Sequence, residues 1–270
     1  MIFKSIILGV LQGLTEFLPV SSSGHLVLLE HFIGFKSSGV VFEVLLHFAT
    51  LVAIIIVFSR RIWKIIKAIF TSRIQIKGKH WIVKNENLAL FFYILWASIP
   101  SAVVGIFFKS SIEKLFSNPL LVSIMLFVTG IFLFSTRFIK TKKFHKNNGF
   151  SSTMIGIAQA FAILPGISRS GATISAGLWT GLSREASAEF SFILVIPAII
   201  GAILLEAKEI SELSYQMILV YLLGAIAAFV VGLLSLIGFI KIVKRGKLHY
   251  FAYYCWIVGF ATLLLKIIGK

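Results

Sequence analysis

The sequence predicts an all-α polytopic membrane protein, in which six full transmembrane helices and two re-entrant helical hairpins form an inverted-topology repeat. Hydrophobic side chains make up 58% of the 270 residues and charged side chains only 13%, whereas soluble domains carry about 25% charge. The apolar residues come in separate runs, each long enough to cross the hydrocarbon core of a bilayer. We therefore expect a single integral membrane domain over residues 1–270.

The charge balance and the rare residue types exclude several classes of protein. The net charge is +16, but the cations gather between the apolar runs, which is typical of cytoplasmic loops and predicts a lipid environment with no nucleic-acid partner. Cys255 is the only cysteine, which disfavours disulfides and thiolate metal sites. All acidic residues are Glu, which disfavours an aspartyl-phosphate pump or a Walker-B magnesium site.

Six segments have the length and apolar character of complete membrane spans. They cover residues 39–58, 88–108, 119–136, 186–205, 216–240 and 250–265. Three of the connections, residues 60–86, 137–150 and 241–249, are rich in Lys and Arg and should be cytoplasmic. Residues 109–118 and 206–215 have mixed or acidic charge and should lie outside.

Two further segments are too polar for a span and too apolar for a loop. If residues 151–185 crossed the membrane once, the basic 241–249 loop would move outside, so a hairpin that re-enters from the cytoplasmic side is the economical solution. The same argument makes residues 1–37 a hairpin that opens to the outside. The two hairpins would then have opposite orientations.

An internal comparison supports two related halves, approximately residues 1–110 and 150–240. The string GVLQGLTEFLPVSSSG at 9–24 aligns with GIAQAFAILPGISRSG at 156–171, and each is followed by a Glu near the start of the next span, Glu43 or Glu189. An inverted repeat of this kind places a polar site near the midplane, where the halves meet. The alternative is a chance match between short strings rich in Gly and Ser.

Polar residues inside the first hairpin are candidates for a functional site because ionisable groups are costly in a membrane. Gln12 and Glu16 are four residues apart and share one helix face. Their oxygens suit a hard divalent cation, which typically uses one or two protein carboxylates together with phosphate oxygens. The alternative is that Glu16 only pairs with Arg169 as a structural contact between helices.

The next residues of this hairpin combine hydroxyl groups with an imidazole. Pro19 stops the first arm, and Ser21, Ser22 and Ser23 can cap a second helix whose N-terminus would attract an anion. His25 follows one turn later, so Ser22 and His25 could form a nucleophile and base pair. The alternatives are a purely polar turn for the serines and a structural hydrogen bond between helices for the histidine.

The second hairpin supplies a cation among hydroxyl groups. Pro165 and Gly166 break the helix, and the residues that open the next one are Ser168, Arg169, Ser170 and Thr173. A guanidinium at a helix N-terminus suits a phosphate, so we interpret this segment as a clamp for an anionic headgroup. The alternative is an ion pair of Arg169 with Glu16, Glu43 or Glu189, and both roles can coexist.

The strings QGLTEFLPVSSSGH at 12–25 and LPGISRSGATIS at 164–175 resemble the two signature motifs of the undecaprenyl-diphosphate phosphatases of bacteria, the bacitracin-resistance protein family. The resemblance covers the whole chain. It implies hydrolysis of undecaprenyl diphosphate to undecaprenyl phosphate and inorganic phosphate, which recycles the lipid carrier of cell-wall synthesis. It also implies a need for a divalent cation, Mg²⁺ or Ca²⁺, and a site in the plasma membrane that opens to the external face.

Carried over by position, the motifs of the family assign the roles. The catalytic residues would be Glu16, Ser22, His25 and Arg169; the substrate-binding residues Ser21, Ser23, Ser168, Ser170 and Thr173; and the metal ligands Glu16 and Gln12. A glutamine at position 12 leaves Glu16 as the only carboxylate of its motif, which puts a two-carboxylate cage in doubt. Ser22 would attack with His25 as its base, or water would attack directly with Ser22 as a ligand only.

Two questions stay open at this level. Inverted repeats, broken helices and a midplane anion site also describe a flippase for a prenyl-phosphate lipid, which would have no use for a Ser and His pair. A stripe of small residues lets helices approach closely, either at the face of a homodimer or in internal packing. The stripe comprises Gly224, Ala225, Ala227, Ala228 and Gly232.

Overall fold

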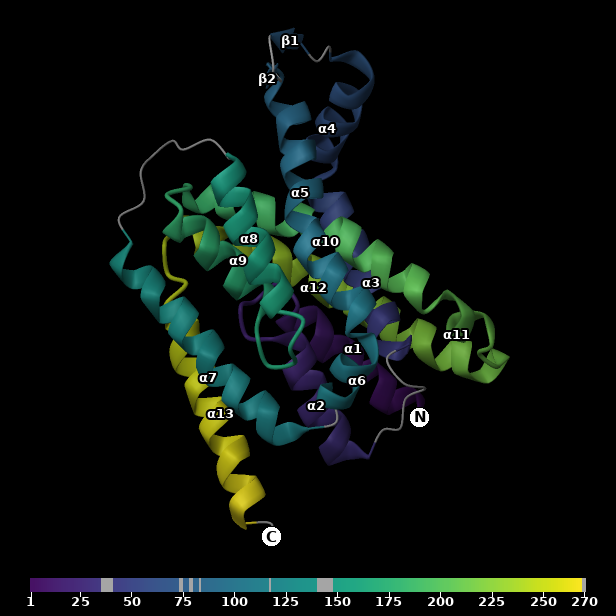
Figure 1. Ribbon diagram of the computed structural model, residues 1–270. Coiled ribbons are helices and arrows are strands. Elements are labelled where there is room, and N and C mark those ends of the chain that lie inside the picture. Colours follow the sequence, from purple (N-terminus) through teal and green to yellow (C-terminus); the bar gives the residue numbers. More distant parts are fainter. Residues whose placement is uncertain are drawn as a thin grey trace.

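The computed structural model describes residues 1–34, 41–72, 75–77, 80–82, 84–116, 118–139 and 148–268. In these residues α-helices dominate, and the only strands form one short antiparallel hairpin (Figure 1). The elements are α1 (Ile2–Thr15), α2 (Ser22–Ile33), α3 (Val41–Val57), α4 (Ser59–Thr71), β1 (Gln75–Lys77), β2 (His80–Ile82), α5 (Glu86–Phe107), α6 (Lys109–Phe116), α7 (Pro119–Ser135), the 3-10 turn η1 (Thr136–Phe138), α8 (Gly149–Phe161), α9 (Arg169–Trp179), α10 (Arg184–Leu205), α11 (Ala207–Ser211), α12 (Tyr215–Lys244) and α13 (Tyr250–Ile268).

Short polar side chains set where the long helices begin. Asn85, Asn118 and Asn148 each accept a hydrogen bond from a backbone N–H in the first turn of α5, α7 and α8. Ser183 and Ser214 do the same for α10 and α12. These side chains replace the partners that the first N–H groups of a helix lack.

The predicted all-α polytopic membrane fold is confirmed. Four helices of the described chain are long and apolar enough to span a bilayer by themselves: α5, α7 extended through η1, α10 and α12. Helices α3 and α4 reach that length only as a pair that is bent by 81°, and α13 is a shorter apolar helix. All six predicted spans are therefore helical, although residues 39 and 40 of the first lie outside the described residues.

Both predicted hairpins are present as pairs of short helices. Residues 1–34 fold into α1 and α2, and the Lys4 ammonium donates to the carbonyl of Ile33 at 2.6 Å, which closes the open end of the hairpin. Residues 35–37 of the predicted hairpin lie outside the described residues. Residues 149–179 fold into α8 and α9, which pack against each other.

Segments that we predicted as loops contain helices. The predicted basic loop 60–86 holds α4, and the loops 109–118 and 206–215 hold α6 and α11. On α4, Ile65 and Ala68 are buried while Lys64 and Lys67 are exposed, so a charged segment forms a helix because one of its faces is apolar. Arg73, Lys79 and the cations of 140–147 lie outside the described residues.

Each hairpin packs against a long helix from the other half of the chain. Helix α1 packs along α12, and α8 packs along α5. These contacts are close because glycines face backbone: a Cβ on Gly9 would lie 2.1 Å from the carbonyl oxygen of Gly224, and one on Gly156 would lie 2.5 Å from that of Ala97. Three residues of the small-residue stripe of α12, Gly224, Ala228 and Gly232, thus serve internal packing, since they face α1.

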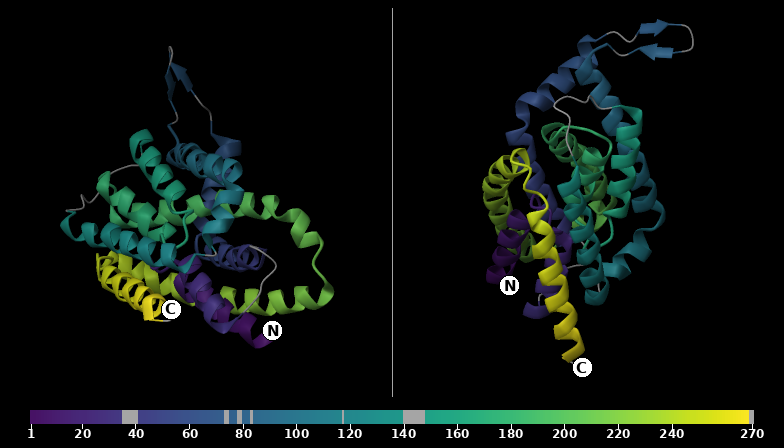
Figure 2. Two further views of the ribbon diagram at one scale, coloured as in Figure 1. Left: turned by 60° about the horizontal axis from the view of Figure 1, so that its bottom comes forward. Right: turned by 90° about the vertical axis from the view of Figure 1, so that its left-hand side faces the viewer.

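The core joins α3, α9, α10 and α12 behind the hairpins. Phe17 of the first hairpin stacks edge-on against Phe192, which in turn contacts Phe239. Helices α7 and α13 lie side by side along one flank, as both views in Figure 2 show. The hairpin turns meet at the centre, where a Cβ on Gly24 would touch Gly166 and one on Gly171 would touch Pro19.

Candidate active site

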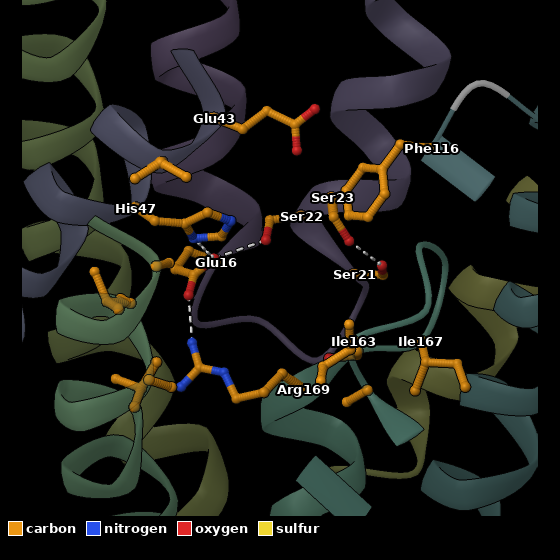
Figure 3. Close-up of a pocket in the computed structure, with 17 residues that line it drawn as sticks. Glu16, Ser21, Ser22, Ser23, Glu43, His47, Phe116, Ile163, Ile167 and Arg169 are labelled. Carbon is orange, nitrogen blue, oxygen red and sulfur yellow. Dashed lines mark hydrogen bonds and ion pairs between the residues drawn. The ribbon is translucent and has the colours of Figure 1, made fainter. Parts of the chain in front are cut away.

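A pocket of about 280 Å³ lies where the two hairpin turns meet α3 and α10 (Figure 3). The first hairpin contributes Glu16 and the three serines 21–23, and the second contributes Ser168 and Arg169. Helix α3 adds Glu43 and His47, and α10 closes the pocket with the apolar side chains of Val195 and Ile199. The pocket thus combines charged and hydroxyl side chains of the hairpin turns and α3 with apolar side chains of α10.

The Glu16 carboxylate is the centre of the polar wall. It is buried, with 5% of the residue exposed, at the end of α1. Its Oε2 accepts hydrogen bonds from the Ser22 hydroxyl at 2.7 Å and from the Gln12 amide at 3.1 Å. Its Oε1 accepts a hydrogen bond from the guanidinium of Arg169. One carboxylate therefore orients a hydroxyl and compensates a cation from the opposite half of the chain.

Arg169 begins helix α9 and has donors to spare. One terminal nitrogen, Nη2, pairs with Glu16, while the other, Nη1, is buried without a partner in the described chain. A buried guanidinium nitrogen without an acceptor is costly, so this nitrogen predicts a ligand with acceptor oxygens. The prediction that Arg169 lies at the start of a helix is confirmed, and its pairing with Glu16 coexists with a free nitrogen.

The serine caps at the two turns are arranged alike. Ser21 and Ser168 are the N-caps of α2 and α9, and their hydroxyls accept from the N–H of Gly24 and Gly171 at 3.2 and 3.1 Å. Ser21 also has a φ of 68°, the one positive φ among the described non-glycine residues. Such strain persists only where the surroundings enforce it, and here it directs the next residue, Ser22, onto Glu16.

The structure does not bring His25 to Ser22. The Nδ1 of His25 lies 2.8 Å from the Ser21 carbonyl oxygen, and Nε2 lies 2.9 Å from the Tyr254 hydroxyl of α13. Both nitrogens are thus engaged, and the Ser22 hydroxyl donates to Glu16 instead. Here His25 ties the turn to α13, and the predicted Ser22 and His25 pair is not assembled.

Three other predicted site residues, Gln12, Ser170 and Thr173, do not line the pocket but contact residues that do. Gln12 bonds to Glu16 from outside the pocket lining. Ser170 lies 3.3 Å from the Ser168 hydroxyl, and Thr173 donates to the Arg169 carbonyl at 2.7 Å. Both of these residues are buried, so the hydroxyls that we predicted on the substrate shape the start of α9 rather than line the pocket.

Two residues of α3, Glu43 and His47, line the pocket although we predicted neither as a site residue. The Nδ1 of His47 lies 3.1 Å from Glu16 Oε2 and 2.9 Å from Gln12 Nε2. Figure 3 shows the Glu43 side chain extending into the pocket above His47. The two residues are four apart in an apolar span, so they share one helix face, and this spacing was the signal available. Glu189, the counterpart of Glu43, pairs with Arg61 at 2.6 Å instead.

Thr129 of α7 was also missed because it lies far away in sequence. Its hydroxyl donates to the Gly166 carbonyl at 2.8 Å and accepts from the Ser168 N–H at 2.9 Å. It thus braces the turn that presents Arg169.

The residues around Glu16 fit a divalent cation in part. Gln12 Oε1 is buried without a partner, and the carboxylates of Glu16 and Glu43 line one pocket. In the described chain, no cluster of three or more His, Cys or carboxylate side chains could hold a metal ion. This donor set suits Mg²⁺ or Ca²⁺ that shares its coordination sphere with water and phosphate oxygens.

Comparisons with known proteins place the chain among relatives. The family model described as bacitracin resistance protein BacA matches residues 5–261. A protein of Desulforapulum autotrophicum named undecaprenyl-diphosphatase is 41% identical over 269 residues, which cover 97% of this chain and 98% of that protein. Proteins with the same name from Methanobrevibacter smithii and Alkaliphilus metalliredigens are 40% and 37% identical, each over at least 97% of both chains.

Proposed function

Because this chain belongs to the bacitracin resistance protein family, we propose that it hydrolyses undecaprenyl diphosphate to undecaprenyl phosphate and inorganic phosphate. The observation that carries the proposal is the buried Nη1 of Arg169, which has no protein acceptor, beside a hydroxyl already aligned on a carboxylate. The reaction returns the lipid carrier to cell-wall synthesis and counters bacitracin. The alternative of a prenyl-phosphate flippase is not favoured, since the relatives are named for hydrolysis.

The diphosphate would bind against the turn of the second hairpin. The free Nη1 of Arg169 would donate to its oxygens, and the backbone at the start of α9 would add a positive field. Ser168 and Ser21 also line the pocket, and their hydroxyls would donate to the same phosphate oxygens. Arg169 would then stabilise the charge that develops as the bridging P–O bond breaks.

Ser22 is the proposed nucleophile. Its hydroxyl donates to Glu16 at 2.7 Å, so Glu16 would orient the oxygen for attack on the terminal phosphorus and accept its proton. The bond between the Ser22 oxygen and phosphorus forms as the bond to the bridging oxygen breaks and undecaprenyl phosphate leaves. Water then attacks the phosphoserine and leaves as part of the inorganic phosphate, while Glu16 returns the proton to the Ser22 oxygen. This role of Glu16 replaces the one we predicted for His25, whose nitrogens point elsewhere. Direct attack by water, with Ser22 as a ligand, is the remaining alternative.

Glu16 and Glu43, the two carboxylates that line the pocket, are the proposed ligands of a divalent cation, Mg²⁺ or Ca²⁺. Gln12, which we predicted as a further ligand, would hold Glu16 in place from behind the lining. When bound, the cation would neutralise phosphate charge. The proposal extends to position: the protein would lie in the plasma membrane with the pocket open to the external face, as the loop charges predict. The apolar helices α5, α7, α10 and α12 make it a multi-pass membrane protein.

Phosphate release from undecaprenyl diphosphate by purified protein in detergent tests the function. We expect release with Mg²⁺ or Ca²⁺, and none with EDTA. Arg169→Ala and Glu16→Ala should lower kcat by roughly 10²–10³, because each removes a contact made in the transition state. Arg245→Ala is the matched control, since Arg245 is exposed at the end of α12 and should retain wild-type activity.

A trapped phosphoserine distinguishes the two forms of the mechanism. Rapid quenching followed by mass spectrometry should find phosphate on Ser22, and Ser22→Ala should abolish that signal. If wild-type protein binds the lipid but releases no phosphate under any cation condition, the hydrolase assignment is wrong.

A further inference from the structure

A second cavity of about 540 Å³ adjoins the candidate active site. It lies between α5, α8 and α10, whereas the first pocket lies between the hairpin turns and α3. The two share Arg169 and five apolar side chains, those of Ala162, Ile163, Val195, Ala198 and Ala202. They are therefore two arms of one space that meets at the guanidinium.

The two arms differ in chemistry. The first holds Glu16 and its partners Ser22 and His47. The second is lined mainly by small and aliphatic side chains of α5 and α10. At its outer end stand Ile106 and Leu204, which are 60% and 71% exposed on helices long and apolar enough to span a bilayer. A space that begins at a cation and ends among exposed apolar side chains suits an amphipathic anion with a hydrocarbon chain.

The two halves of the chain differ in the surroundings of their equivalent glutamines, Gln12 and Gln159. In the first half, the Gln12 amide donates to Glu16 from behind the lining of the charged arm, so this glutamine lines neither arm. In the second half, the equivalent Gln159 donates to Ser101 and lines the apolar arm. Alongside Gln12, α1 and α12 are in close contact at Gly13, where a Cβ would lie 2.7 Å from the Ala228 carbonyl oxygen. The open passage thus lies on the side of α5 and α10.

We propose that the prenyl chain of the substrate leaves the active site through the cavity between α5 and α10 and enters the lipid past Gly105 and Gly201. This inference rests on the proposed hydrolysis of a prenyl diphosphate. The volume falls within the range of small-molecule sites, about 300–1,000 Å³, so the cavity would hold only the first isoprene units. The rest of the chain would lie in the bilayer.

Gly105 and Gly201 offer a direct way to close this passage. Both line the cavity, and a Cβ added at either would meet no atom within 4 Å. A larger side chain at these positions would therefore occupy the space of the chain without striking the protein. Gly238 is a matched control, because it is likewise open on α12 but does not line the cavity.

The first experiment measures kinetics of Gly105→Leu, Gly201→Leu and Gly238→Leu. For undecaprenyl diphosphate, kcat/KM should fall at least about tenfold in the first two variants, because a filled apolar pocket rejects the chain, and stay unchanged in the third. The inhibition constant of inorganic diphosphate, which has no chain, should stay unchanged in all three. Unchanged kcat/KM in both cavity variants, or weaker diphosphate binding that matches the kinetic loss, would overturn the proposal.

The second experiment locates the chain without relying on turnover. A prenyl monophosphate with a photoreactive group on its first isoprene unit is crosslinked to wild-type protein, and the labelled peptides are mapped by mass spectrometry. We expect label on α5 and α10; label on α1 and α12 would refute the proposed passage. If wild-type protein releases no phosphate yet labels α5 and α10, the proposed hydrolysis fails while the lipid passage stands.

Discussion

The two oxygens of Glu16 serve opposite halves of the chain. Oε1 neutralises Arg169 from the second hairpin, and Oε2 accepts the hydroxyl of Ser22 from its own hairpin. A carboxylate that breaks free of this arrangement would leave a buried cation without a partner, which is strongly destabilising. Glu16 therefore both orients the proposed nucleophile and joins the two hairpins, and residues that keep Glu16 in place should matter for both.

His47 is such a residue. Replacing it with leucine removes the contact of Nδ1 with Glu16 at 3.1 Å, so the carboxylate can rotate away from Ser22. We expect His47→Leu to lower kcat by roughly 10–100-fold, as is typical when a supporting partner of a catalytic ligand is lost. His47→Gln should recover part of the loss because its amide can still donate to Glu16. The measurement is steady-state phosphate release.

The control is His249→Gln, since His249 lies between α12 and α13 and does not line the pocket. A wild-type kcat in His47→Leu would contradict the assigned role.

Tyr254 should stabilise the first hairpin through His25. Tyr254→Phe keeps the ring that stacks on His25 but removes the hydroxyl that bonds to Nε2 at 2.9 Å. A hydrogen bond of this kind contributes about 1 kcal/mol, so we expect a lower melting temperature in detergent and an activity within about tenfold of wild type. Tyr253→Phe serves as control, because its hydroxyl has no hydrogen bond in the described chain. An unchanged melting temperature in Tyr254→Phe would show that the contact contributes nothing.

Local signals predicted the caps but not the long-range partners. Serines after a helix-breaking proline indicated Ser21 and Ser168 as starts of helices, because capping depends on a few neighbouring residues. Tyr254 is 229 residues from His25, and Thr129 is 37 from Gly166. No sequence periodicity connects such pairs. The orientation of the His25 ring, and therefore the identity of the group that bonds to Ser22, could be seen only in the three-dimensional structure.

At the level of elements, apolar length predicted the spans better than charge predicted the loops. The long helices α5, α10 and α12 were expected within a few residues, since about 20 apolar residues leave few alternatives. Helix α4 was not, because its cations masked the apolar face that Ile65 and Ala68 bury. Its exposed Trp63 and Lys64 give it the character of a helix that lies in the membrane interface.

Glycine contacts at the helix crossings give a test of the paired packing. Gly9→Ala and Gly156→Ala should each destabilise the protein by about 1–3 kcal/mol, because the new methyl would overlap a carbonyl of α12 or α5. Gly238→Ala should be neutral or slightly stabilising, since its site is open and alanine favours a helix. Melting temperatures in detergent measure all three. Equal stability of the three variants would contradict the close approach of the helices.

At the scale of the whole molecule, the contacts are paired across the two halves. Helix α1 lies on α12 as α8 lies on α5, and the turns touch reciprocally through Gly24 and Gly171. We propose on this basis that residues 1–110 and 150–240 are inverted repeats. The chemistry is divided between them, since the first half supplies the carboxylate and the proposed nucleophile and the second supplies the guanidinium. Both halves line the proposed chain passage, through α5 and α10.

The loops predicted to share a side of the membrane also lie together. Lys109 and Glu206, from the two predicted external segments, form an ion pair of 2.6 Å. Arg184, at the start of α10, approaches Gly246 in the predicted cytoplasmic loop between α12 and α13. Segments predicted to be external thus contact each other, and so do segments predicted to be cytoplasmic. The charge pattern gave a side for each loop separately and did not predict these contacts.

This grouping permits a test of orientation in intact cells. Cysteines are placed one at a time at Ser211, near Glu206, and at Lys247, in the loop that Arg184 approaches, and both positions are exposed. The native Cys255 is fully buried and should give little background. A thiol reagent that cannot cross membranes should label Ser211→Cys in intact cells and label Lys247→Cys only after permeabilisation, because the basic loop stays in the cytoplasm. The reverse labelling pattern would mean that the protein has the opposite orientation, with the opening of the first hairpin inside the cell. The proposal that the site opens to the external face would then be wrong.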